Sequence, residues 1–176
     1  MIFTDSDLQE MARLLEVPSL SIQVRPIWGS MNENHRDLIR ADLESQGSQI
    51  YSISHTENLG GYAMIPESPA LKIGFDVEQI ARVTDAIARR VCEDPREFLE
   101  APSAAALWCA KEAGFKSLQG PDQPAVIPWV TPYGWKRVSH YETFQIRCRQ
   151  NLPGLKTRGL SFQKGDYQFA IVCRSN

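Results

Sequence analysis

The sequence predicts an α+β fold, because amphipathic helical segments and β-prone segments both recur along its 176 residues. The helical patterns fall before Gly120, whereas the remainder of the chain is rich in strand patterns. A chain of this length buries roughly two-thirds of its extended surface, and 43% hydrophobic with 23% charged residues is typical of a globular protein. We therefore expect one domain over residues 1–176, with approximate lobes at 1–68 and 69–176.

The first lobe contains five segments with a regular pattern. They are two helices at 7–16 and 32–46 and three strands at 21–27, 50–55 and 61–65. Thr4 or Asp5 can cap the first helix, and Pro18 closes it. Gly60 and Gly61 precede the last strand, so the last two strands are expected to form a hairpin.

Pro66 and Pro69 separate this lobe from a second group of segments. They are strands at 71–78, 135–149, 155–163 and 167–173 and a helix at 84–93, followed by helices whose first turns could hold Pro95 or Pro102. The last two strands are joined by a tight turn at residues 164–166.

Charge and cysteine content restrict the class of protein. The net charge is -2, yet residues 134–176 carry eight basic side chains against two acidic ones, which would suit an acidic partner or an anionic ligand as well as a solvated sheet face. The four cysteines are widely spaced without a CxxC pair and are expected to be buried thiols. No apolar run is long enough for a membrane span and no signal peptide is evident, so a cytoplasmic location is expected.

The strand at 71–78 carries an acidic pair. Asp76 and Glu78 are two residues apart, so their carboxylates point to the same side of the strand. Two carboxylates this close need a cation, and hard oxygen ligands suit Mg²⁺, which completes its shell with water and substrate phosphates. Such pairs are also common on surface strands, so this motif alone does not decide between a metal site and an ordinary surface.

Two further motifs accompany the acidic pair. Trp108, Glu112 and Lys116 lie four residues apart and form a column on one helix face, which by itself fits an ordinary helix salt bridge. Ser54 and His55 end an apolar strand, where a hydroxyl and an imidazole can bind a phosphate oxygen or serve a structural role.

The order of these motifs resembles the 4'-phosphopantetheinyl transferase signature. SISH at 52–55, IGFDVE at 73–78 and WCAKEAGFK at 108–116 correspond to its Ser-His motif, its acidic strand and its Lys-Glu helix. HRDLIRADLE at 35–44 and YQFAIVC at 167–173 are similar to a helix and a late core strand of the family's surfactin-synthetase type. The chain lacks the Gly-Lys-Pro turn that usually precedes the Ser-His motif.

The resemblance implies a fold of two related small lobes with antiparallel sheets and packed helices. It also implies a transferase activity. Such enzymes, holo-acyl-carrier-protein synthases among them, move the phosphopantetheine arm of coenzyme A onto a serine of an apo acyl or peptidyl carrier protein and release adenosine 3',5'-bisphosphate. The carrier would come from fatty-acid, polyketide or peptide synthesis. A monomer is expected, with a dimer or trimer as alternatives, and neither nucleic acid nor membrane is an expected partner.

The resemblance also assigns roles to individual residues. Asp76, Glu78 and Glu112 would hold Mg²⁺ at the coenzyme A pyrophosphate, and Glu112 would accept the proton of the carrier serine directly or through water. The phosphates would be contacted by a set of basic and polar side chains, namely Ser54, His55, Lys111, Lys116 and Arg36. Asp76, Glu112 and Lys116 form the expected catalytic set. Arg82, Arg89, Arg90 and Lys116 are candidate contacts to an acidic carrier.

Three other readings remain. A catalytically silent relative could bind coenzyme A or a carrier, although it would not need three converging carboxylates, whose repulsion is costly without a metal. A different Mg²⁺-dependent nucleotide enzyme would need a phosphate loop, and no G-x-x-x-x-G-K-[ST] segment occurs. Nucleic-acid binding is supported only by the basic bias of the carboxyl-terminal segment.

Overall fold

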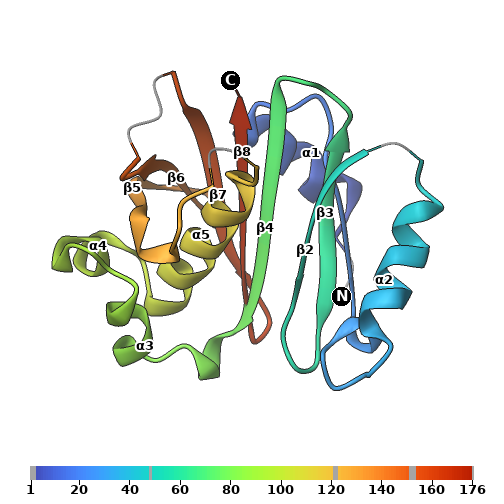
Figure 1. Cartoon of the computed structure of the whole chain (residues 1–176), viewed down its shortest axis with the longest axis horizontal. Helices are drawn as coiled ribbons and strands as arrows, with labels where there is room; N and C mark the ends of the chain where they lie inside the picture. Colours follow the sequence, from blue (N-terminus) through green and yellow to red (C-terminus); the bar gives the residue numbers. More distant parts are fainter. Residues whose placement is uncertain (1–2, 48, 121–122, 151–153, 176) are drawn as a thin grey trace.

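The computed structural model describes residues 3–47, 49–120, 123–150 and 154–175, and it combines two antiparallel sheets with helices packed around them (Figure 1). The three-stranded sheet has the order β1-β3-β2 and the five-stranded sheet the order β4-β8-β7-β6-β5. The strands are β1 (Ser21–Arg25), β2 (Gln49–His55), β3 (Gly60–Pro66), β4 (Leu71–Gln79), β5 (Val130–Val138), β6 (Tyr141–Cys148), β7 (Lys156–Lys164) and β8 (Tyr167–Ser175). The predicted α+β class is confirmed.

Four of the five described α-helices, all but α2 (His35–Glu44), begin at a side-chain cap. The other helices are α1 (Asp5–Leu15), α3 (Asp85–Arg90), α4 (Pro95–Glu100) and α5 (Ala104–Ser117), with 3-10 turns η1 (Pro26–Trp28), η2 (Ile80–Arg82) and η3 (Ile127–Trp129). The Thr4 and Thr84 hydroxyls accept from backbone N–H groups at the starts of α1 and α3, and the cap at Thr4 was predicted. Pro95 occupies the first turn of α4, but Pro102 lies outside α5, which is capped by Ser103.

One expected strand is divided in the structure. The β-prone segment at 135–149 is divided by a turn at Ser139 and His140 into the ends of β5 and β6. Ser139 adopts a left-handed conformation with φ of 56°, which residues other than Gly, Asn and Asp rarely do, so no sequence signal marked this turn. The hairpin of β2 and β3 and the tight turn between β7 and β8 form as predicted.

The two sheets meet at their edge strands, β2 and β4 (Figure 1). Serine side chains of β2 make the connection: Ser52 Oγ accepts from the Phe75 N–H at 2.9 Å, and Ser54 Oγ accepts from the Val77 N–H at 3.3 Å. These bonds satisfy buried backbone donors on the free edge of β4. We call this line of contact between β2 and β4 the seam.

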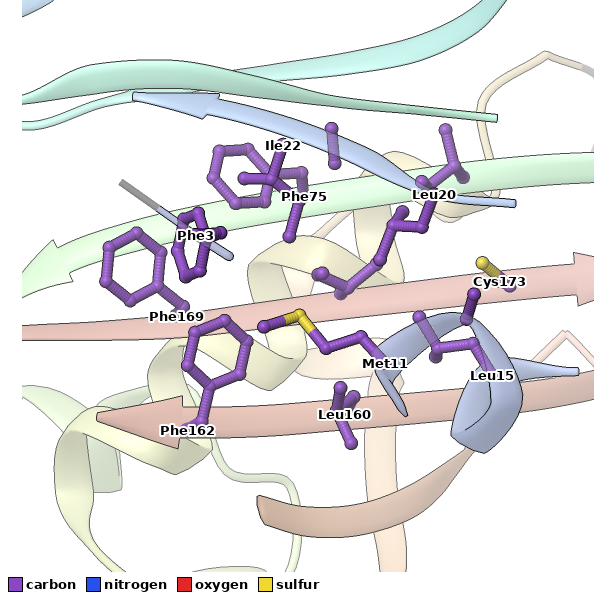
Figure 2. Close-up of a cluster of buried hydrophobic side chains, with 14 of the residues drawn as sticks. Phe3, Met11, Leu15, Leu20, Ile22, Phe75, Leu160, Phe162, Phe169 and Cys173 are labelled. Carbon is purple, nitrogen blue, oxygen red and sulfur yellow. The ribbon is translucent and has the colours of Figure 1, made fainter. Parts of the chain in front are cut away.

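Buried side chains of both sheets and of α1 form a shared hydrophobic cluster. Figure 2 shows Ile22 of the first sheet close to Phe75 of the second, with Met11 of α1 packed over the strands. Phe162 and Phe169 stack in this core with ring centroids 5.3 Å apart. The alternation of β4 places Phe75 in this core and leaves the neighbouring Asp76 on the opposite face, toward α5.

Helix α5 packs closely on β4 because Gly74 has no side chain. A Cβ at Gly74 would lie 1.8 Å from the Ala113 carbonyl oxygen and 2.6 Å from the Ser117 nitrogen, both backbone atoms of α5. Any larger residue must therefore push the helix off the strand. This close approach sets the distance between the acidic strand and the Glu112–Lys116 face of the helix.

We predict that Gly74→Ala destabilises the fold by about 3 kcal/mol or more, because backbone atoms of α5 cannot move aside as a flexible side chain can. Urea unfolding followed by circular dichroism measures this change. Gly47→Ala is the matched control: φ is 79° and nothing lies within 4 Å of the added Cβ, so it should cost only about 1–2 kcal/mol of left-handed strain. Equal losses in the two variants would contradict the packing argument.

Candidate active site

Asp76 is the centre of a buried polar cluster at the seam. Its side chain lies under α5 and the residue is only 2% exposed. The Oδ1 atom accepts two hydrogen bonds of 2.7 Å, one from the Ser54 hydroxyl of β2 and one from the Lys116 ammonium of α5. The Oδ2 atom is buried without a hydrogen-bond partner in the described part of the chain. One carboxylate therefore joins three elements and retains a free oxygen.

The helical column predicted on α5 faces this acidic strand. Trp108 donates from Nε1 to Glu78 Oε1 at 3.2 Å, and Lys116 Nζ also donates to the Phe75 carbonyl at 3.2 Å. Glu112 lies between them on the same helix face. Both ends of the column thus contact β4, which brings Glu112 near the acidic pair.

Burial and mutual repulsion change the acidity of these groups. Burial, together with the neighbouring Asp76 carboxylate, raises the pKa of Glu78 to about 7. The pKa of Glu112 is raised by the same two causes, while Lys116 opposes the rise. Burial disfavours the charge of Lys116, but the adjacent Asp76 outweighs it and the net pKa of Lys116 is raised. The cluster thus pairs Glu78, which can take up a proton near neutral pH, and Glu112, whose pKa is also raised, with a lysine that stays charged.

Residues from the first sheet complete one side of the cluster. Ser54 and His55 end β2, with Ser54 bonded to Asp76 and His55 half-buried beside it. Arg36, on α2, is exposed, and its charge is one of the causes that lower the pKa of His55, after burial and His35. The structure therefore brings these three predicted residues to the same end of the seam as Asp76.

A sequence profile of the 4'-phosphopantetheinyl transferase superfamily matches residues 72–172, which is more than half of the chain. The chain belongs to the 4'-phosphopantetheinyl transferase superfamily. The match begins at β4 and ends in β8, so it includes Asp76, Glu112 and Lys116. A search of curated proteins found no match. Membership indicates a phosphopantetheine-transferring enzyme, with coenzyme A and a carrier protein as its general partners.

The three carboxylates at this site are ligands of the kind that a hard cation such as Mg²⁺ prefers. Asp76, Glu78 and Glu112 supply only oxygen, and the unpartnered Asp76 Oδ2 is an available ligand atom. Among the described residues, however, no three His, Cys, Asp or Glu side chains are arranged to hold a metal ion. Two of the carboxylates have other partners: Lys116 and Ser54 bind Asp76, and Trp108 binds Glu78. Metal binding by this set stays a prediction.

Lys111 does not join the cluster, although it stands next to Glu112 in the superfamily motif. Its side chain is 0% exposed and forms an ion pair with Glu97 of α4, which is 4% exposed. Lys111 Nζ also donates to the Val130 carbonyl at 2.6 Å. Consecutive helical residues point about 100° apart, so Lys111 turns away from β4 where Glu112 faces it. The expected phosphate contact of Lys111 does not fit this placement.

Glu97 was missed by the sequence reasoning. Its Oε1 accepts from the Glu93 and Asp94 backbone N–H groups, and Asp94 in turn caps α4. The D-x-x-E spacing of Asp94 and Glu97 was a capping-box signal that could have identified this helix start. No sequence pattern linked Glu97 to Lys111, which lies on another helix.

The described part of the chain has no helix that is long and apolar enough to cross a membrane.

We predict that Lys111→Met lowers the free energy of unfolding by about 3–5 kcal/mol, because it leaves the buried Glu97 carboxylate unpaired. Adding Glu97→Gln should restore part of the loss, since a glutamine oxygen still accepts from the α4 backbone but carries no charge. Chemical denaturation of the single and double variants measures the coupling. Additive losses would show that the two side chains do not act as a pair.

We further predict that Glu78→Gln stabilises the metal-free protein at alkaline pH. Folded Glu78 retains its proton up to about pH 7, whereas the unfolded chain releases it near pH 4.5, so stability falls as pH rises through this window. Removing the carboxyl removes this loss, a gain on the order of 2–3 kcal/mol at pH 8 that vanishes near pH 4.5. Denaturation in chelator at both pH values tests it, with the exposed Glu100→Gln as control. An unchanged pH dependence in Glu78→Gln would refute the assignment.

Proposed function

We propose that the protein is a holo-acyl-carrier-protein synthase. It transfers the 4'-phosphopantetheine group of coenzyme A to a serine of an apo acyl or peptidyl carrier protein, uses Mg²⁺, and releases adenosine 3',5'-bisphosphate. The observation that best supports this proposal is the convergence of Ser54 and Lys116 on the buried Asp76 at the seam. Superfamily membership indicates phosphopantetheine transfer in general. The cluster contains carboxylates and an ammonium group, which are suited to that reaction.

In this proposal Asp76, Glu78 and Glu112 hold Mg²⁺. The ion would supply positive charge to the pyrophosphate of coenzyme A as the bond to the leaving oxygen breaks. The free Asp76 Oδ2 supports this role, because an unpaired carboxylate oxygen in a buried site is costly unless a ligand satisfies it. The raised pKa of Glu78 supports it as well, since a cation would relieve the repulsion that contributes to the shift.

The proton and the phosphate charge are handled by side chains of α5. The carrier serine oxygen attacks the β-phosphorus, the bond from phosphorus to the bridging oxygen breaks, and the serine proton passes to Glu112 directly or through water. A raised pKa makes Glu112 a better proton acceptor than an ordinary glutamate. Lys116 remains charged and can neutralise the developing negative charge on the phosphate oxygens.

Coenzyme A binding is assigned to Ser54, His55, Arg36 and Lys116. Since these groups come from both sides of the seam, lobes 1–68 and 69–176 act as one unit and a single chain can form the site. The proposal includes a carrier from fatty-acid, polyketide or peptide synthesis in the cytoplasm. Lys111 is not included, because its ammonium is bound to Glu97.

The test is intact mass spectrometry of purified apo carrier proteins after incubation with the protein, coenzyme A and Mg²⁺. We expect a gain of roughly 340 Da, the mass of the phosphopantetheine arm, that requires Mg²⁺. Asp76→Ala and Glu112→Gln should abolish the gain, because each removes one proposed metal ligand and Glu112→Gln also removes the base. Glu112→Gln should leave the circular dichroism spectrum unchanged, whereas Asp76→Ala leaves the partly buried Lys116 unpaired, so a melting curve checks that this variant is folded under the assay conditions. Glu100→Gln, an exposed carboxylate on α4, should behave as the wild type.

Two results would contradict the proposal. Wild-type turnover in Glu112→Gln would remove that residue from the reaction. No mass gain with fatty-acid, polyketide and peptide-synthesis carriers, despite coenzyme A binding, would favour a catalytically silent relative.

A further inference from the structure

Two imidazoles pack against each other at the end of the seam. His35 is the first residue of α2 and His55 is the last residue of β2, and their ring centroids are 4.5 Å apart with an interplanar angle of 49°. His35 is only 9% exposed. Pairing two groups that can both become cationic is unfavourable unless an anion balances them.

The hydrogen bonds of His35 leave one ring nitrogen unused. His35 Nδ1 lies 2.7 Å from the Asn32 carbonyl oxygen, which can only accept, so Nδ1 carries a proton and donates it. Within the described residues, His35 Nε2 is buried and has no hydrogen-bond partner. Protonation of Nε2 would make the ring a cation with a second donor.

A second unsatisfied group lies beside His55. Thr56 is 6% exposed, and its Oγ1 has no hydrogen-bond partner in the described part of the chain. A buried polar group without a partner costs about 1–3 kcal/mol, so the unpaired His35 Nε2 next to the His55 ring favours a polar ligand at this end of the seam. The start of α2 adds to this, because Asn34 forms no side-chain cap there and helix N-termini attract anions.

The charges around the pair also favour an anion. Burial lowers the pKa of His55 first, and the nearby positive groups of His35, Arg36 and Lys116 lower it further, against an opposing effect of Asp76. His55 and Thr56 line a pocket of about 420 Å³ that extends to Glu78 and Trp108 of the active site. Its other charged lining groups, Arg82 and Glu57, form a 3.0 Å salt bridge with each other.

We propose that His35 is a further phosphate-binding residue, which pairs with His55 to hold a phosphate group of coenzyme A and takes up a proton when the ligand binds. This inference rests on the proposed function for the identity of the ligand. The proton comes from solvent and goes to the imidazole pair, and no covalent bond changes. Affinity should therefore fall as pH rises above neutral, since the pair must be protonated to balance the phosphate charge.

Isothermal titration of coenzyme A tests the proposal without turnover. Titrations at pH 7 in two buffers with different ionisation enthalpies measure the protons taken up on binding. His35→Asn keeps an N–H near the Nδ1 position for the Asn32 carbonyl but removes Nε2, so it should weaken binding about tenfold and take up fewer protons than the wild type. His35→Gln places an N–H near Nε2 and should recover part of the affinity but none of the proton uptake.

The exposed His140, outside the site on the turn before β6, provides the matched control. His140→Asn should bind coenzyme A with wild-type affinity and wild-type proton uptake. In turnover, His35→Asn should raise the KM for coenzyme A and leave kcat near the wild-type value. A variant that is merely less well folded would lower kcat through loss of active protein instead, and melting curves of each variant check this.

Titrations with coenzyme A and with 3'-dephospho-coenzyme A distinguish binding of the 3'-phosphate from binding of the pyrophosphate. If the pair holds the 3'-phosphate, His35→Asn will not weaken binding of 3'-dephospho-coenzyme A; if it holds the pyrophosphate, both ligands will lose affinity equally. Wild-type binding and proton uptake in His35→Asn would overturn the inference and leave the proposed function intact. Absence of coenzyme A binding by the wild type would overturn both.

Discussion

The hydrogen bonds to Asp76 Oδ1 connect the parts of the molecule on which the site depends. Ser54 reaches this oxygen from the first sheet and Lys116 reaches it from α5, so one buried carboxylate fixes a strand edge and a helix relative to β4. A buried carboxylate is tolerated only when charge and hydrogen bonds offset its desolvation, which the two donors do here. Gly74, two residues earlier, allows the helix to come close enough for Lys116 to reach. Geometry and electrostatics of the site are therefore set by the same short strand.

The sequence predicted most of the elements and the local alignment of the site residues within β4 and within α5. Alternation along 71–78 correctly placed Asp76 and Glu78 on one side of the strand, and helical spacing correctly aligned Trp108 with Lys116. These are local periodicities, which follow from backbone geometry alone. The division of β5 from β6 at Ser139 was not predicted, because a left-handed backbone is not favoured by a serine and so has no signal in the residue type.

Contacts between distant segments could not be read from spacing. Lys111 and Glu112 are neighbours in one motif, yet one pairs with Glu97 in the interior and the other faces the acidic strand. The resemblance treated both as site residues, and only the packing of α4 against α5 distinguishes them. His35 illustrates the opposite case: no role was assigned to it from the sequence, and only its contact with the His55 ring marks it as a candidate site residue.

The seam carries opposite charges at its two sides, and this decides which ligand fits. Asp76, Glu78 and Glu112 form an acidic side on β4 and α5, while Arg36 makes the facing side basic and lowers the pKa of the neighbouring His55. A bare anion would be repelled by the carboxylates and a bare cation by the basic side, so either alone satisfies only half of the site. A phosphate-bearing ligand accompanied by a divalent cation satisfies both, because its phosphates can face the basic side while the cation lies at the carboxylates. In the proposed reaction, this charge pattern would favour simultaneous binding of Mg²⁺ and coenzyme A over independent binding of each.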